Sequence, residues 1–180
     1  SFCATHAIKF QAVQVEINQT GQGFEAAARS ARQEIFNAYE DGTAIILGHH
    51  MDDQVETVFF RVLRGTGMKG LTGMQRHLTS KGKDLIRPLL NISKDEILKY
   101  ASINKLEFIE DESNQDNTYS RNFLRNKVIP RIMERWPGAK KNTARMANLL
   151  SKQSALYHKY LSEKLEMVCD EDGLLLDKLA

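Results

Sequence analysis

Five side chains suited to acid–base or metal chemistry lie close together: His49, His50, Asp52, Asp53 and Glu56. Mg²⁺ prefers carboxylate oxygens and commonly binds beside substrate phosphates, so the group predicts a phosphate-facing site with Asp53 as a metal ligand. Zinc is less expected, because no cysteine is near and the H-E-x-x-H spacing is absent. The alternative is that the acids cap a helix and the histidines face solvent.

The flanking residues predict a strand before this group and a helix after it. Residues 43–47 form an apolar run of strand length. Apolar residues then recur at the spacing of one helix face, at Val55, Val58, Phe59, Val62 and Leu63. Asp52 or Asp53 is the expected N-cap of that helix. Open α/β sheets bind ligands outside the carboxyl ends of their strands, which is where this group falls.

The segments around this unit predict a parallel sheet with flanking helices. Residues 12–17 alternate apolar and polar side chains, as in a strand, and residues 24–39 have helical periodicity. Strands that alternate with helices at these distances indicate βαβ units and a Rossmann-like α/β fold.

The remaining chain predicts a more helical part. The glycine-rich residues 65–73 are expected to form a loop, and residues 74–86 a hairpin. Ser93 and Glu96 fit a capping box that begins a helix. A helix over residues 119–129 is expected to be interrupted by Pro130. A long linker helix is predicted beyond Pro137, followed by a new strand at residues 174–176.

Basic groups follow the first helix in the motif that begins at Arg64 and continues through Gly65 and Thr66. Arginine can grip a phosphate with two parallel hydrogen bonds, and a glycine loop lets the backbone approach the same anion. Arg64, Arg61 and Lys69 could equally complement the dipole at the end of the helix.

Residues 117–145 carry the clearest charge asymmetry in the sequence. Their basic residues, opposed only by Glu134, are Arg121, Arg125, Lys127, Arg131, Arg135, Lys140, Lys141 and Arg145. Basic helices with nearby aromatic side chains are typical of RNA-binding surfaces. The alternative is the solvated face of an ordinary helix. Asn114, Arg121 and Asn122 favour directed hydrogen bonding over a merely solvated face.

Composition excludes some classes of protein. The 180 residues carry a net charge of +2, too small by itself to indicate nucleic-acid binding. No apolar run reaches the roughly 20 residues of a membrane span. Cys3 and Cys169 show no metal-ligand spacing, which predicts reduced thiols in a cytoplasmic protein.

Several motifs resemble the tRNA(Ile)-lysidine synthetase family, a branch of the PP-loop ATP pyrophosphatases. They are H-H-M-D-D-Q-V-E-T from His49, R-V-L-R-G-T-G from Arg61, I-R-P-L-L from Ile86, and E-D-E-S-N from Glu110 with Y-S-R-N-F-L-R from Tyr119. The last pair is the most specific to the lysidine branch. The resemblance covers nearly the whole chain, most weakly at its two ends.

The resemblance implies an adenine nucleotide hydrolase-like fold and a ligase. Such an enzyme uses ATP and Mg²⁺ to adenylate the wobble cytidine of tRNA(Ile) with a CAU anticodon, and L-lysine then displaces AMP. We expect catalytic roles for His50, Asp52, Asp53 and Arg64, and substrate or ATP contacts at His49, Glu56, Gly65, Thr66 and Asn114. The residues expected to bind tRNA are Arg121, Asn122, Arg125 and Arg131. A cytoplasmic enzyme is expected, with a homodimer as a candidate assembly.

The family's S-G-G-x-D-S phosphate loop is absent from these residues. The sequence therefore predicts part of a PP-loop catalytic domain over residues 1–136, with a linker helix and the start of another domain over 137–180. We expect this stretch alone to release no pyrophosphate from ATP. The alternatives are another PP-loop ligase, a tRNA thiolase, or an RNA-binding module without catalysis.

Overall fold

The computed structural model describes residues 2–17, 24–109, 111–170 and 173–174. The chain divides into two compact units. One comprises Ser1–Ile45 with Thr79–Asp84, and the other comprises Ile46–Leu78 with Leu85–Ala180. The candidate site residues lie in the second unit.

The first unit contains two helices, α1 (Phe2–Thr5) and α2 (Phe24–Asn37). The strand predicted over residues 12–17 is wrong, because this stretch has no regular secondary structure. Val13 and Val15 are 49% and 43% exposed. Alternation alone does not make a strand, since its backbone needs a neighbour to bond.

The sheet has three strands, β1 (Ala44–Ile46), β2 (His77–Ser80) and β3 (Lys83–Ile86), in the order β1-β3-β2. The predicted hairpin is confirmed, with Lys81 and Gly82 in its turn at φ 49° and 73°. Two positive φ angles are typical of the type I′ turn, whose twist suits a tight hairpin. The sheet is therefore mixed, which corrects the expectation of a parallel sheet.

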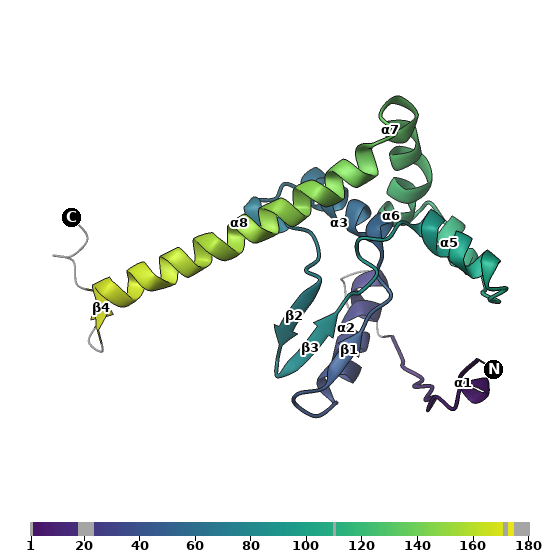
Figure 1. Ribbon diagram of the computed structural model, residues 1–180, viewed down its shortest axis with the longest axis horizontal. Coiled ribbons are helices and arrows are strands. Elements are labelled where there is room, and N and C mark those ends of the chain that lie inside the picture. Colours follow the sequence, from purple (N-terminus) through teal and green to yellow (C-terminus); the bar gives the residue numbers. More distant parts are fainter. Residues whose placement is uncertain (1, 18–23, 110, 171–172, 175–180) are drawn as a thin grey trace. The chain divides into compact units, whose positions relative to one another are not determined.

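Helices dominate the second unit (Figure 1). In chain order they are α3 (Met51–Leu63), α4 (Met68–Leu71), α5 (Lys94–Ile103), a 3-10 turn (Glu112–Gln115), α6 (Ser120–Phe123), a π-helical turn (Leu124–Val128), α7 (Ile129–Arg135) and α8 (Ala139–Val168). The glycine-rich loop thus contains the short helix α4, which was not predicted. The capping box at α5 is confirmed, because Glu96 N–H donates to Ser93 Oγ and Ser93 N–H donates to the Glu96 carboxylate.

The N-cap of α3 is His50, and the expectation of Asp52 or Asp53 is wrong. Asp53 occupies the third helical position, where its Oδ2 accepts the backbone N–H of His50 at 2.9 Å. Both acids lie in the first turn, where the helix dipole favours negative charge.

Pro130 does not interrupt the helix that precedes it. Residues 120–135 are helical without a break, and the π-helical turn lies immediately before α7. Proline lacks an N–H and its ring crowds the carbonyl four residues earlier. A wider turn at this point relieves both conflicts, so the helix continues past Pro130.

The predicted long helix is α8, which packs against α3, α4 and α7. The core of this unit is apolar, and its buried members include Val55, Val58, Leu124, Ile129 and Ala147. After α8, the strands β4 (Cys169–Asp170) and β5 (Gly173–Leu174) pair antiparallel. The predicted strand at residues 174–176 is therefore seen at Leu174, and residues 175–176 lie outside the described part. Over the described residues, no helix is both long and apolar enough to cross a membrane.

Candidate active site

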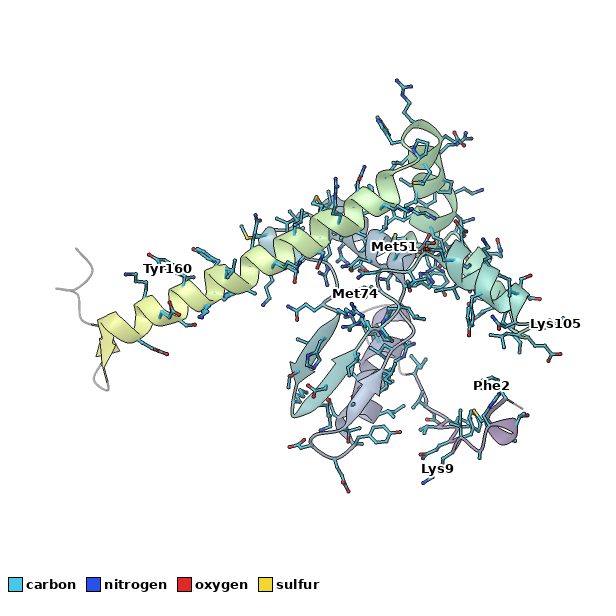
Figure 2. The ribbon with its side chains drawn as sticks, in the orientation of Figure 1. Phe2, Lys9, Met51, Met74, Lys105 and Tyr160 are labelled. Carbon is cyan, nitrogen blue, oxygen red and sulfur yellow. The ribbon has the colours of Figure 1, made fainter. Side chains whose placement is uncertain are left out.

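A polar pocket of about 430 Å³ lies where the first turns of α3, α5 and α8 meet the 3-10 turn and the π-helical turn. Figure 2 shows side chains crowded around Met51, at the start of α3, while those near Tyr160 on α8 stand apart. The residues that line the pocket are His50, Asp52, Asp53, Val55, Glu56, Lys94, Asp95, Asn114, Arg125, Asn126, Ile129 and Lys140.

Glu56 and Arg125 form the most buried ion pair of this pocket. The guanidinium donates from Nε to Glu56 Oε1 at 2.6 Å and from Nη2 to Oε2 at 2.9 Å. The Glu56 side chain is only 2% exposed. The hydrogen bonds to Glu56 raise the pKa of Arg125 above its ordinary value, although burial opposes this shift. The guanidinium is therefore fixed on the Glu56 side chain in a two-bond geometry.

Further hydrogen bonds tie the loop of residues 113–116 to the helical segment that carries Asn122 and Arg125. Arg125 Nη1 donates to Asn114 Oδ1 at 3.0 Å. Asn122 Nδ2 donates to the carbonyls of Ser113 and Asp116 at 2.9 and 2.8 Å. The loop that carries Asn114 is thus held beside α3 through Arg125.

Arg121 also has partners inside the protein. Its Nη2 donates to Thr57 Oγ1 at 2.7 Å, and its Nε lies 3.6 Å from Glu56 Oε2. The directed hydrogen bonding predicted for Asn114, Arg121 and Asn122 is therefore present, but within the chain. That Arg121, Asn122 and Arg125 bind tRNA stays a prediction.

Asp52 is an anchor for α8. Its carboxylate pairs with Lys140 in the first turn of α8, and it accepts the backbone N–H of Lys94 at 2.8 Å. Burial alone would raise the pKa of Asp52, but the hydrogen bonds from Lys140 and Lys94 outweigh burial and hold it below 3.8. Asp52 is consequently a carboxylate at neutral pH, with both its oxygens engaged.

Asp53 and His50 face each other at the entrance of α3. Nδ1 of His50 lies 3.5 Å from Asp53 Oδ2, and Arg125 Nη2 lies 3.6 Å from Asp53 Oδ1. His50, rather than His49, lines the pocket, while His49 is half-buried outside it.

The three carboxylates do not fit a site in which the protein itself cages Mg²⁺. Asp52 is paired with Lys140, Glu56 with Arg125, and Asp53 with the helix terminus. Over the described ranges, no group of three or more His, Cys, Asp or Glu side chains is placed to hold a metal ion. That Asp53 binds Mg²⁺ stays a prediction.

The other predicted site residues lie outside this pocket. Arg64 lies over the ring of Phe60, 5.1 Å from its centroid, and lines a different cavity. Gly65 follows it at φ 72°, and Thr66 packs so closely on Gly70 that a Cβ there would meet its Oγ1 at 1.7 Å. Arg131 is exposed and pairs with Glu134 at 3.1 Å. The sequence analysis grouped Arg64 with His50, Asp52 and Asp53, but the structure places Arg64 in a separate cavity.

Four polar lining residues were not predicted: Lys94, Asp95, Asn126 and Lys140. Lys140 had been grouped with the basic run, where its charge gave no sign of a carboxylate partner 88 residues away in the sequence. Asn126 follows Arg125 directly and donates to Asn114 O at 2.9 Å and Asn117 Oδ1 at 3.0 Å. Its place beside a motif arginine was the one signal that could have identified it.

Comparison with known proteins gives two results. A family model described as the PP-loop domain matches residues 1–132. Curated tRNA(Ile)-lysidine synthases are similar over most of the chain: 38% identical over 96% of it in Photorhabdus laumondii, 43% over 81% in Legionella pneumophila strain Lens, and 39% over 97% in Enterobacter sp. strain 638. The chain spans 39%, 34% and 41% of the length of these relatives, respectively.

Proposed function

The chain belongs to the PP-loop domain family, and on that premise we propose that it supplies the catalytic pocket of a tRNA(Ile)-lysidine synthase. The observation that carries the proposal is the convergence of His50, Asp53 and Glu56 with Asn114 and Arg125 in one pocket. These residues come from the two motifs that carry the resemblance, and they are far apart in the sequence.

The proposed reaction has two steps. ATP adenylates the C2 carbonyl oxygen of the wobble cytidine in tRNA(Ile), and pyrophosphate leaves. The amine of L-lysine then attacks C2, the bond from C2 to the adenylated oxygen breaks, and AMP leaves. The attacking amine must lose a proton as the new C–N bond forms, so the pocket needs a proton acceptor.

His50 is the proposed acceptor of that proton, because it lines the pocket and an imidazole nitrogen is the proton acceptor most often used in general base catalysis. Asp53 lies beside it and would stabilise the imidazolium that results. The Glu56–Arg125 pair positions Asn114 and fixes one side of the pocket. The pocket therefore surrounds the incoming amine and the cytidine base with charged side chains held in fixed positions.

Gly65 and Thr66 are proposed to contact ATP from outside this pocket, because a glycine loop lets backbone N–H groups approach an anion. The exposed Arg131 is the proposed tRNA contact on the basic segment, since surface arginines neutralise RNA phosphates. Such a reaction takes place where tRNA and ATP are both present, which for this family is the cytoplasm.

The test is lysine incorporation by a protein of the relatives' full length that carries these residues. The protein is incubated with ATP, radiolabelled L-lysine and a tRNA(Ile) transcript with a CAU anticodon. We expect ATP-dependent label in the tRNA and equimolar AMP. Absence of label, with the transcript bound normally, would contradict the proposal.

Asp53→Asn sharpens this test. Asparagine keeps an oxygen to accept the His50 N–H at the helix start, because Asn and Asp are both good capping residues. The variant therefore removes the charge with little effect on α3. We expect at least a tenfold fall in adenylation, with tRNA affinity within a few-fold. Equal losses of adenylation and tRNA affinity would count against a role for Asp53 at the phosphates or as a metal ligand.

A further inference from the structure

A second cavity, of about 660 Å³, lies at the other end of α3. It shares no lining residue with the polar pocket. The residues that line it are Phe60, Leu63, Arg64, Asn117, Thr118, Ser120, Phe123, Leu124 and Val128. Its volume falls within the range of roughly 300–1,000 Å³ that small-molecule sites occupy.

The walls of this cavity are apolar and include two aromatic rings. Phe60 comes from α3 and Phe123 from α6, and Phe123 is 49% exposed. Leu63 is 68% exposed. Exposed aromatic rings that flank a cavity are the surfaces on which unpaired bases stack, because every base offers a π-face.

Polar groups border the same cavity on the side of Asn117, Thr118 and Ser120. Asn117 is held in place because its Oδ1 accepts from Asn126 Nδ2 at 3.0 Å. Thr118 Oγ1 is likewise oriented by its hydrogen bond to Asp116 Oδ1 at 2.7 Å. An aliphatic ligand could not form hydrogen bonds with such groups, whereas a nucleobase presents donors and acceptors along its edge.

Arg64 adds a cation to this cavity. Its guanidinium lies over the ring of Phe60 at 5.1 Å. In the described part of the chain, no carboxylate forms an ion pair with it. A stacked guanidinium keeps its N–H edge available, and that edge matches a phosphate.

We propose that this cavity binds one unpaired nucleotide, with its base against Phe123 and its phosphate at Arg64. The source argued here is a loop nucleotide of the RNA substrate, because Lys127, Arg135 and other basic residues lie on the same helical segment. The inference rests on the proposed function for the identity of the RNA. A free nucleotide shares the same chemistry, so the experiment includes it as a separate arm.

The experiment measures binding of a labelled stem–loop RNA with a CAU anticodon loop to the 180-residue chain by fluorescence anisotropy. Phe123→Ala removes the ring, and Phe123→Leu keeps apolar bulk without a π-face. Trp136→Ala is the matched control, because Trp136 is an exposed aromatic residue of the same basic segment outside the cavity. We expect about tenfold weaker binding for Phe123→Ala, an intermediate loss for Phe123→Leu and little change for Trp136→Ala.

A second experiment identifies which loop nucleotide places its base in the cavity. RNAs with one abasic loop nucleotide each are bound to the unchanged chain and to Phe123→Ala. At the position that occupies the cavity, loss of the base and loss of the ring should not add, because each removes the same contact. Additive losses at every loop position, together with unchanged AMP binding, would overturn the proposal.

AMP binding, measured by calorimetry, separates the two sources. Weaker AMP binding in Phe123→Ala and Arg64→Ala, with RNA binding intact, would support a nucleotide site but assign it to the free nucleotide. Failure of lysine incorporation with RNA binding still dependent on Phe123 would count against the proposed function and leave this site standing. Circular dichroism of each variant checks that it is folded.

Discussion

The polar pocket and the apolar cavity share two helical segments, α3 and the helical stretch 120–129, but their charged side chains have different surroundings. In the polar pocket, Glu56 and Asp52 each have a basic partner. In the apolar cavity, Arg64 rests on Phe60 without a carboxylate among the described residues. The first region thus pairs its charged side chains with one another, while the second leaves the cation of Arg64 available, as the proposed nucleotide site requires.

The difference has a structural origin in α3. Its first two turns carry the acids and face the loop, α5 and α8, whereas its last turns carry Phe60, Leu63 and Arg64. Arg125 and Asn126 extend toward the first region, while Phe123 and Val128 line the second. Stability and binding should therefore respond differently to substitutions in the two regions.

The largest expected effect is on stability, from Arg125→Ala in the polar pocket. Removing Arg125 leaves the buried Glu56 carboxylate with only Arg121, 3.6 Å away, as a basic partner, which costs about 3 kcal/mol. Urea unfolding followed by circular dichroism measures the loss. Arg131→Ala is the matched control, because the exposed Arg131–Glu134 pair should contribute less than about 1 kcal/mol. Similar losses in the two variants would show that the buried ion pair contributes no more to stability than the exposed one.

Lys140→Met should have a smaller effect, about 1–2 kcal/mol, because Asp52 keeps its bond from Lys94. Methionine preserves the length and apolar bulk of the side chain. Lys159→Met is its control on the same helix, since the Lys159–Glu163 pair is exposed. If Lys140→Met lowered the free energy of unfolding no more than Lys159→Met does, the Asp52–Lys140 pair would not anchor α8.

The same pair predicts a pH dependence. The folded state lowers the pKa of Asp52, so the carboxylate contributes stability above its ordinary value of 3.8. That contribution is lost as the pH falls through the lowered value, because the unfolded chain binds the proton more readily. Unfolding midpoints between pH 5 and pH 2 should therefore decline less steeply in Lys140→Met. Parallel declines in the two proteins would argue against the assignment.

Phe123→Ala should change stability by less than about 1 kcal/mol, because the ring is half exposed, although it weakens RNA binding. Leu124→Ala is the informative neighbour: Leu124 is 4% exposed, and its truncation should cost about 2–5 kcal/mol. Thermal unfolding of both variants gives the comparison. A large loss in Phe123→Ala would make the cavity wall part of the core.

The smallest effect on the fold is expected for Arg131→Ala, which tests the basic surface. Its removal should weaken RNA binding uniformly and reduce the slope of log affinity against log salt by about 1. Binding titrations at several salt concentrations measure that slope. An unchanged slope would leave Arg131 as a surface ion pair with Glu134.

Local patterns predicted those elements that depend on local contacts. The periodicity from Val55 to Leu63 identified α3, the Ser93–Glu96 box identified the start of α5, and the segment beyond Pro137 identified α8. The strand over residues 12–17 failed because pairing, unlike periodicity, needs a neighbour. The N-cap was misplaced by two or three residues because the capping acid lies inside the helix it caps.

Long-range partners were beyond the reach of local patterns. Arg121 and Arg125 suggested an RNA-facing helix, yet their partners Thr57 and Glu56 lie 64 and 69 residues away in the sequence. A basic run has the same composition whether it faces solvent or a buried carboxylate. Both members of each pair belong to the motifs that carry the resemblance, but the resemblance did not indicate that they contact each other.

The π-helical turn before Pro130 makes the number of residues in this segment as important to the structure as their side chains. A π-helical turn holds one residue more than the α-helical turn it replaces, because its hydrogen bonds run to the fifth residue instead of the fourth. Deleting one residue between Leu124 and Val128 would let the turn close to α geometry and would bring the Pro130 ring back against the carbonyl four residues earlier. The helix would then kink before α7, which would move Arg121 away from Thr57 and Phe123 away from its cavity. Sequences that share this architecture should therefore vary here by substitution and hold their length constant.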